Sequence, residues 1–217
     1  MGVLDAVIVA NAPWHWSPET VALVRRVQLV LAADGGANHL ARVGIAPAAV
    51  VGDLDSILPP VRRWLGERCM VLRADQEHTD LHKALAYAFD ERGAERVTVL
   101  AATGGRLDHA LENLALLARW AERGELAFEG EDARVVAVLG QATHATFVGQ
   151  TVSLMPLGRC EEVWTGGLQW RLAGEPLDLA ARTGVCNRAT ADRIDLRVAG
   201  GALLVFLHHP SKTLQPG

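Results

Sequence analysis

Short runs of apolar, β-branched residues alternate with helical patterns from residue 1 to about 130 of the chain. This alternation is typical of a parallel sheet whose strands are joined by crossover helices. One helix has a clear start, with Ser17 as its N-cap and Pro18 in the first helical position. A second helix follows Thr79 and ends near Gly93. A third follows Gly105. The strands are expected at residues 6–10, 28–33, 48–52, 70–73 and 97–101.

The third helix contains leucines at helical spacing. We expect Leu107, Leu111, Leu114 and Leu117 to form its apolar stripe, with Arg106, Asp108 and His109 at its first turn.

The pattern changes after about Glu131 to β-branched stretches broken by glycine. Residues 199–202, Ala-Gly-Gly-Ala, separate two alternating apolar runs and predict a β-hairpin. We therefore expect an α/β domain over residues 1–131 and a smaller antiparallel β domain over residues 132–217. The strands of the second domain are expected at residues 135–139, 146–148, 152–155, 194–198 and 203–207.

The composition argues against several classes of partner. The 217 residues carry a formal net charge of −4, with no Lys/Arg run, which does not favour binding to nucleic acid or an anionic membrane. No segment reaches the roughly 20 apolar residues of a membrane span, and the first 11 residues are expected to be a strand and not a signal peptide. Three widely spaced cysteines favour a reducing, cytoplasmic setting and argue against a structural zinc site.

Polar clusters follow several of the predicted strands. Because the carboxyl ends of parallel strands meet at one edge of a sheet, clusters far apart in sequence can converge there. Carboxylates gathered in one place repel each other, and Mg²⁺ relieves this by binding carboxylate and phosphate oxygens. The clusters are Asp34-Gly35-Gly36-Ala37-Asn38, Gly52-Asp53-Leu54-Asp55-Ser56, Asp75-Gln76 with Thr79-Asp80, and Thr103-Gly104-Gly105-Arg106-Leu107-Asp108-His109.

Each cluster also has a simpler structural interpretation. Asp53 and Asp55 could bind one cation beside Gly52, or Asp55 or Ser56 could cap the next helix. Asp34 could cap a helix or lie at a ligand site. Asp80 and Lys83 are three residues apart and could form an ordinary surface ion pair on a helix, or Lys83 could bind phosphate.

The fourth cluster is a weaker motif by itself. The Gly104-Gly105 turn resembles a phosphate-binding loop but lacks the lysine of a P-loop. Arg106 suits phosphate oxygens, whereas His109 is either a general base or a structural residue.

Taken in this order, the clusters resemble the thiamine pyrophosphokinase family. The resemblance implies an N-terminal catalytic domain, a C-terminal β domain and a homodimer with thiamine sites at the subunit interface. It also implies transfer of diphosphate from ATP to thiamine, with AMP as the second product. The likeness continues through Ser153-Leu154-Met155-Pro156-Leu157, Thr165-Gly166-Gly167-Leu168-Gln169-Trp170, Gly184-Val185-Cys186-Asn187 and Gly201-Ala202-Leu203-Leu204-Val205.

The resemblance also assigns roles to residues. It implies that Mg²⁺ is bound by Asp53 and Asp55, with Asp75 and Asp80 as further ligands. The implied catalytic group is Asp53, Asp55, Asp80, Lys83 and Arg106, with Lys83 and Arg106 on phosphate oxygens and one aspartate available as a proton acceptor. The implied substrate-binding residues are Asp34, Asn38, Asp75, Gln76, Thr79, Asp108, His109, Asn113, Trp170, Cys186 and Asn187.

The chain departs from the family pattern near the expected acceptor site. Cys186 stands where the family usually has serine, and Arg188 where an acidic residue is frequent. By residue type alone, Cys186 is expected to be buried, and Trp170 either packs in a core or stacks on a flat ring. A diphosphokinase for another heteroaromatic alcohol, such as a hydroxymethylpterin, and a non-catalytic thiamine- or nucleotide-binding protein are the alternatives.

Overall fold

The computed structural model describes residues 3–210. The chain divides into two compact units, Met1–Gly130 and Glu131–Gly217. Within the described residues, no helix combines the length and apolar character needed to cross a membrane.

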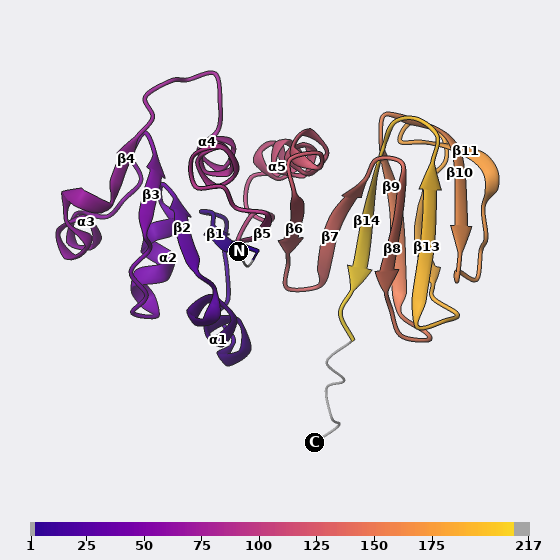
Figure 1. Ribbon diagram of the computed structural model, residues 1–217, viewed down its shortest axis with the longest axis horizontal. Coiled ribbons are helices and arrows are strands. Elements are labelled where there is room, and N and C mark those ends of the chain that lie inside the picture. The colour runs from indigo at the N-terminus through magenta and orange to yellow at the C-terminus, as the bar shows by residue number, and fades with distance from the viewer. Residues whose placement is uncertain (1–2, 211–217) are drawn as a thin grey trace. The chain divides into compact units, whose positions relative to one another are not determined.

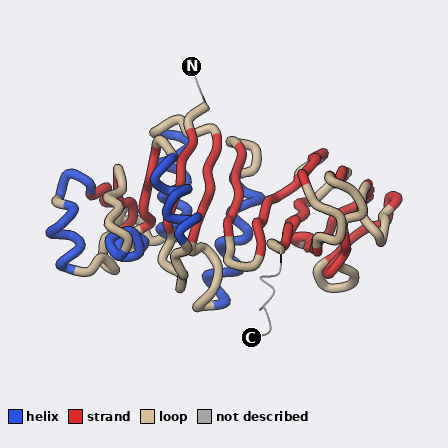
Figure 2. Tube along the Cα trace, turned by 90° about the horizontal axis from the view of Figure 1, so that it is seen from below, coloured by secondary structure: helices blue, strands red, loops and turns tan. Residues whose placement is uncertain are grey.

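The first unit is built on a parallel sheet with the strand order β6-β5-β1-β2-β3-β4. Helices cover both faces of this sheet, with α4 and α5 on one face and α1 and α2 on the other (Figures 1 and 2). The five strands expected in this part of the chain are confirmed to within one residue at each end. The strands are β1 (Asp5–Val9), β2 (Leu29–Ala33), β3 (Ala49–Gly52), β4 (Met70–Leu72), β5 (Arg96–Leu100) and β6 (Glu125–Glu129).

The helix starts expected from the sequence are also present. Ser17 Oγ accepts a hydrogen bond from the backbone N–H of Thr20 at 3.2 Å, and Pro18 opens α1. Thr79 caps α4 in the same way, and a π-helical segment continues the helix towards Gly93. The helices are α1 (Pro18–Arg26), α2 (Gly36–Arg42), α3 (Pro59–Leu65), the 3₁₀ turn η1 (Glu67–Cys69), α4 (Asp80–Ala86), the π segment η2 (Tyr87–Glu91) and α5 (Leu107–Trp120).

The strand order changes direction at β1. The chain adds β2, β3 and β4 on one side of β1, then returns to add β5 and β6 on the other. The chain therefore continues from β1 and from β5 towards opposite edges of the sheet. The loops after these two strands diverge, which leaves a crevice at the carboxyl ends of β1 and β5.

The apolar stripe expected on α5 is wrong in its first half. Leu107 is 86% exposed and Leu111 is 60% exposed. The face of α5 that packs on the core carries Asn113, Leu116, Leu117 and Trp120, so the first leucines lie on a different side of the helix.

The second unit contains two antiparallel sheets, with orders β12-β9-β14-β7 and β11-β10-β13-β8. Side chains from both sheets, such as Leu154, Val163, Ile194 and Val205, belong to one apolar core. The strands are β7 (Ala133–Val138), β8 (Gln141–Ala145), β9 (Thr151–Leu157), β10 (Arg159–Gly166), β11 (Ala173–Asp178), β12 (Gly184–Arg188), β13 (Arg193–Val198) and β14 (Ala202–His208).

The predicted hairpin at residues 199–202 is wrong. The strands on either side of this segment, β13 and β14, belong to different sheets and do not pair with each other. The segment carries the chain from one sheet to the other, and Gly201 adopts a φ of 87° at a point where a Cβ atom would lie 2.4 Å from the carbonyl oxygen of Arg159. Each strand thus presents its apolar residues to the shared core from a different sheet, an arrangement that local turn residues do not reveal.

The strand expected at residues 146–148 is also wrong. This segment is the connection between β8 and β9, and Val148 is 72% exposed. Thr146 is tied instead to the 191–192 loop, because its Oγ1 donates to the carbonyl of Ala191 at 3.0 Å.

Candidate functional site

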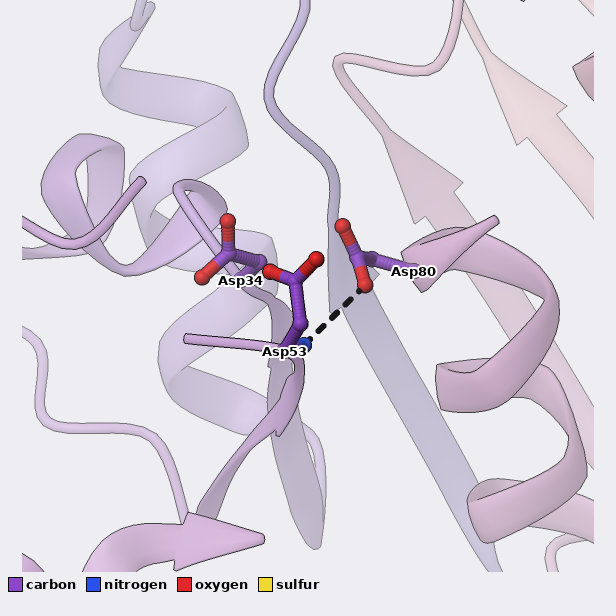
Figure 3. A group of neighbouring side chains, drawn as sticks. All are labelled: Asp34, Asp53 and Asp80. Atoms are coloured by element: carbon purple, nitrogen blue, oxygen red, sulfur yellow. Dashed lines mark hydrogen bonds between the residues drawn. The ribbon is translucent and has the colours of Figure 1, made fainter. Parts of the chain in front are cut away.

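Three carboxylates from distant parts of the chain come together at the carboxyl edge of the parallel sheet. Asp34 follows β2, Asp53 follows β3, and Asp80 is the first residue of α4. Each offers one oxygen atom, and these atoms all lie within 4.8 Å of one another. Figure 3 shows the side chains together, with the backbone N–H of Asp53 donating to Asp80 Oδ1 at 3.3 Å. We call this group the aspartate cluster.

The aspartate cluster has the properties of a cation site. Asp34 is only 3% exposed, and its Oδ2 accepts a hydrogen bond from the Ser56 N–H at 3.1 Å. Its Oδ1 is buried without a hydrogen-bond partner. Burial and the negative charges of Asp80 and Asp53 raise the pKa of Asp34, although the Ser56 hydrogen bond opposes them. A buried carboxylate oxygen with no donor is costly, and a cation would satisfy it.

Asp80 is in a similar electrostatic position. Burial, followed by the charge of Asp53, raises its pKa, and the nearby Lys83 ammonium acts in the opposite direction. Lys83 Nζ lies 3.5 Å from Asp80 Oδ1 and the lysine is 6% exposed. One ammonium group thus faces a cluster of three carboxylates, which leaves excess negative charge.

Gly52 allows the carboxylates to approach each other. Its φ is 154°, and a Cβ atom at this position would lie 2.8 Å from Asp80 Oδ1 and 2.9 Å from the Cβ of Asp34. Two residues later Leu54 has a φ of 67°. The loop after β3 is therefore held in a conformation that fits the cluster and would not fit a side chain at residue 52.

The other two predicted metal ligands lie outside the aspartate cluster. The Asp55 side chain is exposed, and its Oδ1 accepts a hydrogen bond from Ser56 Oγ at 2.8 Å. Asp75 is exposed and lies 3.2 Å from His78 Nδ1. Their roles as metal ligands stay predictions.

A cavity of about 420 Å³ lies beside the aspartate cluster at the switch point between β1 and β5. It includes residues from the loops after β1, β2 and β5, which is the place where ligands bind in open parallel sheets. Seven of the site residues predicted from the sequence line this cavity: Asp34, Gln76, Thr79, Asp80, Arg106, His109 and Asn113.

Arg106 supplies positive charge to this cavity. It is exposed and forms two hydrogen bonds with Asp108, at 2.5 and 3.1 Å. The Arg106 guanidinium is the main reason that the pKa of Asp108 falls to about 2. Asp108 is not among the cavity-lining residues. Because Asp108 accepts both hydrogen bonds from the Arg106 guanidinium, it is placed to orient Arg106.

Asn113 and Asn38 are both anchored to the backbone. Asn113 is 9% exposed, and its Nδ2 donates to the carbonyl of Ala102 at 2.7 Å. Asn38 Nδ2 donates to the Ser56 carbonyl at 2.9 Å, and its Oδ1 accepts from the N–H of Leu58 at 3.0 Å. Only Asn113 also lines the cavity.

The sequence did not predict the positions of three residues: Asp34 in the aspartate cluster, and Asn11 and His78 in the cavity lining. Asp34 was expected to bind substrate and not to join the carboxylate cluster. Asn11 and His78 line the cavity but were not predicted at all. Asn11 comes shortly after β1, so the rule that ligands bind at strand ends could have found it, whereas no pattern distinguishes His78 from its exposed neighbours.

In the second unit, the predicted residues Trp170 and Asn187 line a cavity of about 280 Å³, whereas Cys186 does not. Trp170 is 59% exposed, so it does not pack in the core, and it lines this cavity. Asn187 is 5% exposed and fixes the backbone of Trp170 at both its N–H and its carbonyl. The other lining residues are Leu154, Leu172, Leu177, Arg182, Thr183, Gly184 and Val185.

The expectation that Cys186 is buried is wrong. It is exposed, with a φ of 60°. The pairing of β12 with β9 shifts register between Gly184 and Asn187, and β12 is the edge strand of its sheet. This irregularity turns Cys186 outward, while its N–H donates to Ser153 Oγ at 3.1 Å.

A larger cavity of about 570 Å³ lies on the other sheet of the second unit. It is lined by residues of β8, β10 and β13, where the Arg197 guanidinium lies 4.5 Å from the centre of the Trp164 ring. None of the predicted site residues lines it, so size alone does not identify the functional site.

Two protein-family models match the chain. The model described as "Thiamin pyrophosphokinase, catalytic domain" matches residues 21–127. The model described as "Thiamin pyrophosphokinase, vitamin B1 binding domain" matches residues 141–203. One match falls within each structural unit, and together they include every residue of the aspartate cluster as well as Trp170, Cys186 and Asn187.

Individual proteins agree with this result. The chain is 28% identical to thiamine pyrophosphokinase 1 of Oryza sativa subsp. japonica, a match covering 77% of this chain and 73% of the rice protein. It is 34% identical to the thiamine pyrophosphokinase of Bacillus subtilis over 51% of this chain and 52% of that protein. The resemblance inferred from the motifs is thereby confirmed.

Solved structures show the same fold. The crystal structure of thiamine pyrophosphokinase from Bacillus subtilis has a TM-score of 0.82 and 23% identity, covering 94% of this chain and 98% of that one. The enzyme from Candida albicans has a TM-score of 0.81 at 15% identity, covering 95% of this chain and 90% of that one. The chain belongs to the thiamin pyrophosphokinase family.

Proposed function

We propose that the chain transfers the β,γ-diphosphate of ATP to the hydroxyethyl group of thiamine, giving thiamine diphosphate and AMP. The observation that carries this proposal is the aspartate cluster beside a cavity with a cationic side chain, at the switch point of a parallel sheet. Family membership supplies the identity of the two substrates.

The aspartate cluster fits Mg²⁺. Hard oxygen ligands and excess negative charge favour this ion, and the buried, unpartnered Oδ1 of Asp34 supports a cation at this place. We assign Asp34, Asp53 and Asp80 as its ligands. Bound there with ATP, the ion would supply neutralisation of phosphate charge.

The protein's own groups then position the diphosphate donor. Arg106, oriented by Asp108, is placed to bind phosphate oxygens. Lys83 neutralises part of the charge on Asp80, and we propose that it also attracts the phosphates. Gln76, Thr79, His109 and Asn113 line the same cavity and are proposed to contact the nucleotide.

The second unit is proposed to bind the acceptor. The half-exposed Trp170 indole can stack on a flat heteroaromatic ring at the small cavity that it lines. Cys186 is on the strand that carries Asn187, and its exposed thiol would take the place of the serine hydroxyl usual in the family. We therefore assign residues 1–131 to catalysis and residues 132–217 to thiamine binding and dimerisation.

We further propose a homodimer in the cytoplasm. The exposed apolar residues Phe147, Val148 and Val185 of the second unit are surface that a second subunit would cover, and most soluble oligomers are symmetric. Cys69, Cys160 and Cys186 are all free thiols, which suits a reducing compartment.

The alternative functions have less support. A pterin-directed diphosphokinase would use the same aspartate cluster, but both family models belong to thiamin pyrophosphokinase. A non-catalytic binding protein would not need a cluster of three carboxylates beside a nucleotide-sized cavity.

The proposal is tested by incubating the purified protein with ATP, Mg²⁺ and thiamine. Formation of AMP and thiamine diphosphate, abolished by EDTA and restored by added Mg²⁺, is the expected result. A parallel reaction with 6-hydroxymethyl-7,8-dihydropterin tests the acceptor. Turnover of the pterin alone would remove thiamine as the substrate while leaving the metal assignment in place.

A further inference from the structure

The loop that carries Asp53 is held mainly by side chains of other elements. It links β3 to α3, and α3 begins without a side-chain cap. Instead, the Asp53 N–H donates to Asp80, and the Ser56 N–H donates to Asp34. These two bonds come from carboxylates of the aspartate cluster, so they are available to change when a cation binds.

Asn38 provides two bonds to the same loop that do not involve the cluster. Its Nδ2 donates to the Ser56 carbonyl at 2.9 Å, and its Oδ1 accepts from the Leu58 N–H at 3.0 Å. The two ends of one amide thus bridge backbone groups two residues apart. Both the oxygen and the nitrogen of Asn38 are engaged with the loop, and the residue does not line the cavity.

The helix that carries Asn38 is a fixed support. α2 contacts both β1 and β2. Its first residue, Gly36, is so close to the sheet that a Cβ atom there would lie 1.9 Å from the carbonyl oxygen of Val9. Asn38 therefore joins a helix packed tightly on the sheet to a loop that otherwise depends on charged cluster residues.

We propose that Asn38 is a positioning residue, which holds the 53–58 loop so that Asp53 stays in the aspartate cluster. This inference rests on the proposed metal site and replaces the earlier expectation that Asn38 contacts substrate. Its loss should weaken divalent-cation binding, because the Asp53 carboxylate would no longer be preorganised beside Asp34 and Asp80. The affinity for ATP at saturating metal should change little, because Asn38 is not at the cavity surface.

The test measures Mn²⁺ binding without nucleotide by electron paramagnetic resonance. Asn38→Ala removes both hydrogen bonds, and Asn38→Leu removes them while keeping side-chain volume. Arg42→Gln, an exposed position on the same helix, is the matched control. We expect a rise of about tenfold or more in the Mn²⁺ dissociation constant for both Asn38 variants and no change for the control.

Kinetics provide the second readout. In the Asn38 variants, excess Mg²⁺ should restore much of kcat, and KM for ATP at saturating Mg²⁺ should stay within about twofold of wild type. A rise in KM for ATP with unchanged Mn²⁺ binding would overturn the inference and indicate direct substrate contact.

The outcomes separate this inference from the proposed function. If wild type binds no Mn²⁺, the proposed metal site itself fails. If wild type and both Asn38 variants bind Mn²⁺ equally, the metal site stands and the positioning role is wrong. Failure of both variants to fold, judged by circular dichroism, would also overturn it, because the role would then be general stability.

Discussion

The side chain of Asn187 is hydrogen-bonded to the backbone of Trp170 in both directions. Its Nδ2 donates to the Trp170 carbonyl at 2.7 Å, and its Oδ1 accepts from the Trp170 N–H at 3.1 Å. The same Oδ1 accepts from the N–H of Arg188 at 2.8 Å. A buried amide on β12 thus fixes the loop that presents an exposed indole.

This relationship predicts a selective effect of Trp170→Ala. Loss of ring stacking costs about 1 kcal/mol or more, so KM for thiamine should rise about fivefold or more. KM for ATP should barely change, because Trp170 does not line the cavity proposed for the nucleotide. Steady-state kinetics with each substrate varied in turn provide the measurement.

Trp64→Ala is the matched control for this experiment. Trp64 is 51% exposed on α3 and lines neither of these cavities. Its replacement should leave both KM values unchanged. An equal rise in KM for thiamine in the two variants would remove Trp170 from the acceptor site.

Cys186→Ser should keep or improve the use of thiamine. The substitution restores a hydroxyl donor at an exposed position, and the φ of 60° is equally strained for both residues. kcat/KM for thiamine should be equal to or higher than that of wild type. A loss of about tenfold or more would mean that the thiol itself is adapted to the acceptor.

Asp34→Asn should stabilise the metal-free protein at neutral pH while removing its response to Mg²⁺. Burial and neighbouring carboxylates raise the pKa of Asp34 above its ordinary value of 3.8. The protonated Asp34 carboxyl therefore makes its full contribution to the free energy of unfolding below its ordinary pKa of 3.8. This contribution is lost as the pH rises through the raised pKa of the folded state. Asparagine can still accept the hydrogen bond from Ser56 and carries no charge.

Differential scanning calorimetry checks this prediction. A gain of about 1 kcal/mol corresponds to about 2–4 °C in Tm for a chain of this size. The difference between variant and wild type should grow from pH 4 to pH 7 in EDTA. It should reverse in excess Mg²⁺, and a variant that Mg²⁺ stabilises as much as wild type would exclude Asp34 as a ligand.

Gly52→Ala should strongly reduce metal-dependent turnover. The added Cβ would lie 2.8 Å from Asp80 Oδ1 and 2.9 Å from the Asp34 Cβ, so the carboxylates must separate. We expect kcat to fall by about 10²-fold or more. Gly44→Ala is the control, because Gly44 also has a positive φ, of 63°, but a Cβ there meets nothing within 4 Å. Equal losses of activity in the two variants would attribute the effect to backbone strain.

The single variants Asp53→Asn and Asp55→Asn, compared with each other, test the predicted metal ligands. Asp53 lies in the aspartate cluster, so its replacement should reduce kcat by about 10²-fold or more with little change in folding. Asp55 is exposed outside the cluster, and a comparable loss in its variant would support the sequence-based assignment of Asp55. Near-normal turnover of Asp55→Asn with a normal melting curve would remove Asp55 from the site.

The sequence was most informative where short-range patterns determine structure. Alternation of apolar runs located the strands of the first unit, and Ser17 and Thr79 marked helix starts because capping is local. The assignment of β13 and β14 to different sheets was not predictable in this way, because the two strands pack on one core from opposite sheets. The same limit applies to Leu107 and Leu111, whose exposure depends on how α5 rotates against the sheet.

The candidate site was predictable in part for the same reason. The rule that ligands bind at strand ends brought the acidic motifs to one edge of the sheet. It did not reveal that Asp34 would be buried with an unpartnered oxygen, which depends on Gly52 and the 53–58 loop. Nor did it show that Asn38 and Asn187 engage the backbone, because an asparagine in a motif looks the same whether it contacts a ligand or a loop.

The central claim is tested most directly by following the phosphates of ATP during the reaction with thiamine. In reactions with [γ-³²P]ATP the label should appear in thiamine diphosphate, and in reactions with [α-³²P]ATP it should appear only in AMP, which demonstrates diphosphate transfer in one step. Label from the γ position in thiamine monophosphate, together with ADP, would contradict the account, as would the absence of any labelled thiamine product in the presence of Mg²⁺.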